Sequence, residues 1–137
     1  MPMKKAITQE DLMGCGIACA AFVLDQNYQA TKKYFRTLGD ANKTGYLCRD
    51  LITVLARKGK KYSYNYLKKK IRFKENSIVF IKRSKRYSVG HYLVKTKNGW
   101  MDPWMNFNPL SIDIKKAKSG FRKKLLGKGI YVIAPVG

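Results

Sequence analysis

The stretch CGIACAAFVLDQ, at residues 15–26, contains the most apolar run of the chain. It is rich in alanine and other apolar residues, and several of them recur at helical spacing, namely Ile17, Ala20, Ala21 and Leu24. This pattern predicts a buried helix that begins near Cys15.

The sequence on either side predicts more helices first and strands afterwards. Residues 29–38 predict a second, short amphipathic helix that Gly39 stops, and residues 47–58 predict a third that Gly59 stops. Beyond Gly59 the predicted strands lie at 62–66, 77–81, 90–96, 100–102 and 129–134. Helices followed by strands indicate an α+β fold with N-terminal helices packed on an antiparallel β-sheet.

Length and composition indicate a globular protein. The chain has 137 residues, of which 45% are hydrophobic, so we expect residues 1–137 to form a single domain. Lys and Arg number 29 against 8 acidic residues, a formal net charge of +21. A charge of this size produces a positive electrostatic field that attracts acidic segments of a substrate or another anionic partner. The alternative is that the lysines only keep the surface solvated.

The three cysteines predict a reducing compartment. An odd, small number without framework spacing indicates free thiols rather than disulfides. Polar residues at positions 8–11 interrupt the place where a secretory signal needs an apolar core, so the cytoplasm is the expected location. No apolar run approaches the roughly 20 residues of a membrane span, and nothing in the sequence calls for a cofactor.

Cys15 is the candidate nucleophile. A cysteine at a helix start lies near unpaired backbone N–H groups and the positive end of the helix dipole, which stabilise a thiolate. The flanking Gly14 and Gly16 let the chain turn sharply and let a substrate approach the backbone. Cys19 and Cys48 fit buried packing instead.

The only histidine, His91, is the candidate base. It follows a glycine at the start of an apolar strand, where its ring can face a cleft. A catalytic imidazole also needs a third group to orient it, and Asp102 and Asn106 on the returning strand are the candidates.

The register of one hairpin decides between these two partners. If Asn98 and Gly99 form the corner, Asp102 lies about 13 Å along the strand from His91, and Asn106 stands opposite the histidine. If Lys97 and Asn98 form the corner, Asp102 becomes a diagonal neighbour about 7 Å away. Asn-Gly is the strongest short hairpin signal and favours the first corner, whereas a partnership between His91 and Asp102 requires the second. The sequence leaves both registers open.

Four motifs in order resemble the bacteriocin-processing double-glycine peptidases, a branch of the papain-like cysteine proteases. They are Gln9, then the segment from Gly14 to Ala18, the segment from Gly90 to Val94, and Asp102-Pro103. The resemblance covers nearly the whole chain and implies a papain-like fold. It implies that Cys15 attacks, His91 is the general base, Asp102 orients the imidazole and Gln9 lines the oxyanion hole.

The resemblance also implies a substrate: a peptide bond, after two glycines in that family. The chain departs from the family pattern at Gly14, where an aspartate usually precedes the nucleophile, and it carries no transporter, so we expect a stand-alone peptidase domain. Transferases and deamidases share the same Cys-His machinery and are alternatives.

Two other classes of site compete with an enzyme. Cys15, Cys19, Cys48 and His91 would make a zinc centre, but no C-x-x-C knuckle supports it. Nucleic-acid binding is the second alternative, because basic runs alternate with aromatic residues. These runs lie at 57–61, 68–70, 82–86 and 123–124.

Overall fold

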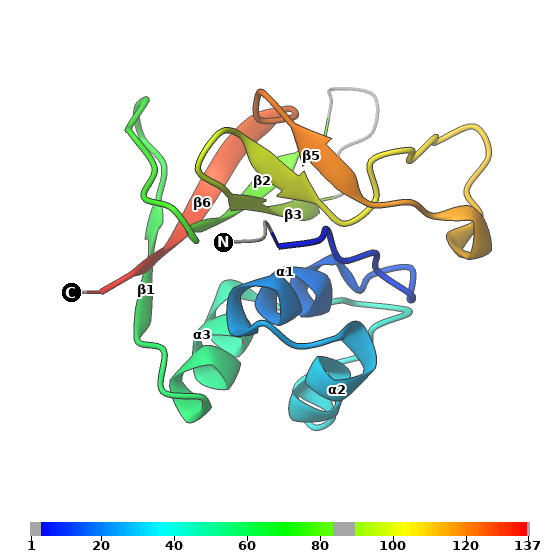
Figure 1. Cartoon of the computed structure of the whole chain (residues 1–137), viewed down its shortest axis with the longest axis horizontal. Helices are drawn as coiled ribbons and strands as arrows, with labels where there is room; N and C mark the ends of the chain where they lie inside the picture. Colours follow the sequence, from blue (N-terminus) through cyan, green and yellow to red (C-terminus); the bar gives the residue numbers. More distant parts are fainter. Residues whose placement is uncertain (1–3, 84–89, 137) are drawn as a thin grey trace.

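A computed structural model describes residues 4–83 and 90–136. Helices come first and strands follow, which confirms the predicted α+β class (Figure 1). The helices are α1 (Cys15–Leu24), α2 (Tyr28–Lys32), the 3-10 turn η1 (Lys33–Phe35), α3 (Cys48–Arg57) and the 3-10 turn η2 (Ile114–Lys116). The strands are β1 (Tyr62–Tyr66), β2 (Ile78–Lys82), β3 (Gly90–Lys95), β4 (Trp100–Asp102), β5 (Gly120–Arg122) and β6 (Lys128–Pro135).

The strands form one antiparallel sheet in the order β1-β6-β2-β3-β4-β5. The last strand, β6, therefore inserts between β1 and β2. The helices α1, α2 and α3 all lie on one side of the sheet, as Figure 1 shows. The sequence did not predict β5, because three residues beginning with glycine give no alternating pattern.

The helices differ from the predictions only at their ends. α1 begins at Cys15 as predicted and is buried along almost its whole length. The second predicted helix is shorter, because it tightens into the 3-10 turn η1 after Lys32. Gly59 has a φ of 78° and ends α3 in the left-handed conformation as expected. Gly39 was predicted to do the same for the second helix, and this was wrong, because it has no positive φ.

Alternate residues of the strands form two hydrophobic clusters. The main core packs α1 and α3 against one face of the sheet, including Ile78, Tyr92 and Ile133. The second cluster contains the alternate strand residues, which point away from the helices, and comprises Val79, Ile81, Leu93, Trp100 and Val132. The connecting segments 67–73 and 125–126 cover this outer face.

Candidate active site

Cys15 is the first residue of α1 and is 7% exposed. The N-cap residue is Gly14, so no N-cap side chain accepts a hydrogen bond from the N–H groups of the first turn. The local structure therefore matches the predicted setting for a stabilised thiolate.

His91 and Asp102 form a direct pair. Nε2 of His91 lies 2.7 Å from Oδ1 of Asp102, and both side chains are buried. His91 is the second residue of β3 and Asp102 is the last residue of β4, so both occupy the same end of the sheet. Because Nε2 is engaged, Nδ1 is the ring nitrogen left for Cys15.

The hairpin between β3 and β4 has the second of the two predicted registers. Lys95 pairs with Trp100, and the Thr96 amide donates to the Gly99 carbonyl at 2.9 Å. The corner is therefore Lys97 and Asn98, which makes Asp102 the diagonal neighbour of His91. An Asn98-Gly99 corner was the stronger local signal and was wrong.

Gly99 is needed for a close approach rather than for the turn. A Cβ atom at this position would run into the backbone carbonyl of Arg122 on β5. Gly99 also has no positive φ, which a type I′ turn would require. The observed register therefore places Gly99 against β5, a strand that the sequence did not reveal.

The carboxylate of Asp102 has three donors. Oδ1 also accepts the Trp104 backbone amide at 2.9 Å, and Oδ2 accepts Nε of Arg122 at 2.7 Å. Burial would raise the pKa of Asp102, but His91, Arg122 and the amide together hold that pKa well below its usual range. Asp102 is therefore a fixed carboxylate that faces the imidazole.

Arg122 is a site residue that sequence reasoning missed. Its Nη2 also donates to the Met105 carbonyl at 3.0 Å, so the guanidinium joins β5 to the chain just after β4. Only the pairing of Trp100 with Arg122 places it there. The sequence contains 29 Lys and Arg residues, so nothing in it distinguished Arg122 from the other basic residues.

Asn106, the alternative partner for His91, lies elsewhere. Its side chain is exposed, with Nδ2 donating to the Lys116 carbonyl and Oδ1 accepting the Lys118 amide. These bonds close the loop between β4 and β5. The structure brings His91 together with Asp102 and not with Asn106.

Cys15 and His91 influence each other's protonation. Burial raises the pKa of the Cys15 thiol, but a hydrogen bond with His91, the imidazolium charge and the Tyr92 amide outweigh it, so the net pKa is lowered. Burial lowers the pKa of His91, but hydrogen bonds with Asp102 and Cys15 outweigh it, so the net pKa is raised. Opposite shifts favour a thiolate beside an imidazolium.

Gln9 lies next to this pair but its amide is engaged. It is 2% exposed, and its Nε2 donates to the carbonyls of Asp11 and Leu12 at 3.0 and 3.1 Å. Its Oε1 is buried without a partner among the described residues. The Gln9 backbone amide donates to the Pro103 carbonyl, which ties this segment to the end of β4.

Tyr28 explains why a glycine precedes Cys15. A Cβ atom at position 14 would run into the Tyr28 hydroxyl. That hydroxyl donates to Oδ2 of Asp11 at 2.7 Å, and Nζ of Lys32 pairs with the same carboxylate at 2.9 Å. The buried acid beside the nucleophile is thus Asp11, held by two residues of α2.

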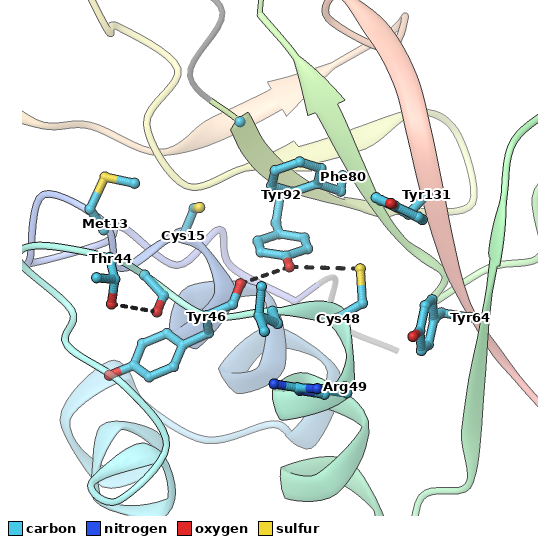
Figure 2. Close-up of a pocket in the computed structure, with 13 residues that line it drawn as sticks. Met13, Cys15, Thr44, Tyr46, Cys48, Arg49, Tyr64, Phe80, Tyr92 and Tyr131 are labelled. Carbon is cyan, nitrogen blue, oxygen red and sulfur yellow. Dashed lines mark hydrogen bonds between the residues drawn. The ribbon is translucent and has the colours of Figure 1, made fainter.

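Cys15 lies between two clefts. The aromatic cleft has a volume of about 400 Å³ and is lined by Cys15, Cys48, Tyr64, Phe80, Tyr92 and Tyr131 (Figure 2). The histidine cleft has a volume of about 190 Å³ and is lined by Gln9, Cys15, Lys43, Arg83, His91 and Trp104. His91 lines only the second cleft, so the two sides of the sulfur differ chemically.

The other two cysteines have structural surroundings. All three cysteines are free thiols. Cys19 is fully buried, and burial raises its pKa well above the usual value. Cys48 borders the aromatic cleft, where the Tyr92 hydroxyl lies 3.8 Å from its sulfur, as Figure 2 shows. Burial also raises the pKa of Cys48, so Cys15 alone has a lowered thiol pKa.

The zinc alternative gains no support from the geometry of the described residues, whereas the nucleic-acid alternative keeps two exposed tyrosines of β1, Tyr64 and Tyr66. Within residues 4–83 and 90–136, no three His, Cys, Asp or Glu side chains gather as a metal site would require. Tyr62 is buried and donates to the Asn76 carbonyl, so it offers no stacking surface. The basic run at 82–86 lies outside the described residues from position 84 onward.

No helix in the described part of the chain combines the length and apolar character needed to cross a membrane.

No protein-family model and no curated protein matches the sequence. Among solved structures, the chain is similar to the peptidase domain of Streptococcus ComA, a bi-functional ABC transporter involved in a quorum sensing pathway. The match has a TM-score of 0.53 at 19% identity and covers 98% of this chain and 100% of that one. The chain therefore has the α+β fold of that peptidase domain.

Proposed function

We propose that this protein is a cysteine peptidase that uses Cys15, His91 and Asp102 as its catalytic triad. The observation that carries the proposal is the 2.7 Å bond between Nε2 of His91 and Oδ1 of Asp102. It fixes the imidazole with Nδ1 available to the thiol at the start of α1. A buried carboxylate, an imidazole and a thiol in series are the parts that nucleophilic acyl transfer requires.

The reaction follows from these positions. The Cys15 thiolate attacks the carbonyl carbon of the scissile bond, and the protonated His91 gives its proton to the leaving nitrogen. This step releases the amine and leaves a thioester on Cys15. His91 then takes a proton from water, the hydroxide attacks the thioester, and the acid product and the thiolate are released.

The developing oxyanion needs donors near Cys15. The Cys15 backbone amide lies in the uncapped first turn of α1 and is the first donor that we propose. The second is Nε2 of Gln9, whose two present acceptors are the carbonyls of the loop just before Cys15. One of those bonds must break when the oxyanion forms.

The two clefts support one direction for the bound substrate. The leaving amine must lie beside His91, and His91 lines the histidine cleft and not the aromatic cleft. The acyl side of the peptide therefore occupies the aromatic cleft, where its walls favour apolar side chains. Lys43 and Arg83 border the leaving side, where they favour an acidic residue.

Peptide cleavage followed by mass spectrometry tests this function. We would incubate the full chain with a mixture of peptides that vary on both sides of the bond, including bonds that follow two glycines. The wild type and a Cys19→Ala control, at a buried cysteine that lines neither cleft, should cleave the same peptides, whereas Cys15→Ala and His91→Ala should cleave none.

The products separate a peptidase from its alternatives. New peptide termini that carry oxygen from labelled water support hydrolysis. Conversion of glutamine side chains without new termini would replace the peptidase with a deamidase, and transfer to an added amine would replace it with a transferase.

A further inference from the structure

The positive charge of this protein is concentrated in its second half. Of the 29 basic residues, 22 follow residue 56, but only 3 of the 8 acidic residues do. The half that supplies α1, α2 and α3 is therefore close to neutral, and the sheet with its connecting segments carries nearly all of the net charge. Such an asymmetry creates a field with a direction rather than a uniformly solvated surface.

Part of this charge surrounds a cleft on the outer face of the sheet. We name it the lysine cleft: it has a volume of about 600 Å³, and its charged lining residues are Lys68, Lys69, Lys70 and Lys128. Its apolar floor includes Leu67, Phe73 and Leu125, which cover the cluster that points away from the helices. It shares no lining residue with the aromatic or histidine cleft.

The lysines of this cleft have no anionic partner among the described residues. None of the four forms an ion pair, and no acidic residue lines the cleft. Two further exposed lysines, Lys123 and Lys124, precede Leu125. Like charges around an apolar floor attract an anion from outside the chain.

We propose that the lysine cleft and its rim form a docking surface for a membrane of anionic phospholipids. Clusters of four to eight cations beside apolar side chains are the pattern by which peripheral proteins bind such membranes. Ile71 lines the cleft among the lysines and is 44% exposed. Its aliphatic side chain can therefore insert into the interfacial region of the bilayer.

The side chains of this face suit lipid better than single-stranded nucleic acid. Base stacking requires exposed aromatic rings, and Phe73 packs against Trp100 with ring centroids 5.1 Å apart. The exposed rings of Tyr64 and Tyr66 pack against Tyr131, and none of these three tyrosines lines the lysine cleft. Lysine, a point charge without bidentate geometry, is sufficient for a surface of phosphate headgroups.

Docking in this way leaves the aromatic cleft accessible. α3 contributes Cys48 and Arg49 to that cleft, and α3 lies on the opposite side of the sheet from the lysine cleft (Figure 1). The proposal does not depend on peptidase activity, because no lining residue is shared.

Vesicle sedimentation tests the proposal. The full chain should sediment with vesicles of phosphatidylglycerol and phosphatidylcholine, remain in solution with pure phosphatidylcholine, and dissociate at high salt. The triple variant Lys68→Gln, Lys69→Gln, Lys70→Gln should partition about a hundredfold more weakly. Ile71→Ser should weaken binding without changing its salt dependence.

A matched variant separates this face from net charge. Lys5→Gln, Lys33→Gln, Arg36→Gln removes the same three charges from exposed positions in the helical half, and it should retain most of the binding. Equal losses in the two triple variants would overturn the proposal. So would tight, lysine-dependent binding of an oligonucleotide without binding to anionic vesicles. Circular dichroism and the melting temperature show that each variant is folded.

Discussion

At the scale of single residues, the opposite pKa shifts of Cys15 and His91 determine how the site responds to pH. The thiol pKa lies below its usual value of about 8.5 and the imidazole pKa lies above its usual value of about 6.5. Lowering the pH protonates the thiolate, and raising it removes the imidazolium proton. The active pair therefore exists only between the two pKa values.

We predict a bell-shaped pH profile for kcat/KM of peptide hydrolysis. Its acid limb should lie below about pH 8.5 and its alkaline limb above about pH 6.5. Asp102→Asn removes the carboxylate whose hydrogen bond raises the pKa of His91, so its alkaline limb should move to lower pH. A single limb that rises near pH 8.5 would mean that Cys15 is an ordinary thiol.

Arg122 should act as a positioning residue. Arg122→Gln removes a charge-assisted bond to the buried Asp102, so kcat/KM should fall by about 10- to 100-fold, the equivalent of about 1.5–3 kcal/mol. The positive charge is also lost near the triad, so the alkaline limb should move to higher pH. The neighbouring Lys123→Gln is the control. A lower melting temperature with an unmoved pH profile would assign Arg122 a purely structural role.

Gln9 has two possible roles that experiment can separate: it stabilises the oxyanion, or it holds the loop before Cys15. If Nε2 stabilises the oxyanion, Gln9→Ala should lower kcat by about 100- to 1,000-fold. Alkylation of Cys15 by iodoacetamide forms no oxyanion, so its rate should stay the same. A parallel loss of both rates would show instead that Gln9 holds the loop before Cys15 through its bonds to Asp11 and Leu12.

At the scale of elements, local patterns predicted the helices and most strands but not the contacts between strands. The apolar run after Cys15, the alternation in β1 and the β-branched or apolar runs of β2 and β3 are properties of neighbouring residues, so the sequence alone indicates them. β5 has no such pattern, yet it supplies Arg122 to Asp102 and excludes a side chain at Gly99. The correct hairpin register therefore depended on a strand that local reasoning could not find.

Gly99 tests this explanation of the register. Gly99→Ala should destabilise the protein by about 1–3 kcal/mol, because the added Cβ meets the Arg122 carbonyl, a backbone atom that cannot rotate away. Asn98→Ala should cost little, because Asn98 is exposed and has no positive φ. Thermal unfolding compares the two variants. Equal losses of stability in the two variants would show that the turn residues, and not the contact with β5, determine the register.

At the scale of the whole molecule, the order of helices and strands was readable from the sequence, and so were the triad candidates. His91 and Asp102 lie on the two strands of one hairpin, and the fold places the start of α1, with Cys15 far earlier in the chain, beside them. The charge asymmetry was also present in the sequence. Its location on the outer face was not, because only the packing shows which side of the sheet the helices leave uncovered.

The rate of alkylation of Cys15 distinguishes an activated nucleophile from an ordinary buried thiol. Iodoacetamide at pH 6.5, followed by peptide mapping, measures Cys15 and Cys48 within the same molecule. An ordinary thiol is only about 1% ionised at this pH, so the thiolate of Cys15 should react on the order of 10- to 100-fold faster than Cys48, and His91→Ala should abolish the difference. Equal rates for Cys15 and Cys48 in the wild type would contradict the assignment of Cys15 as an activated nucleophile.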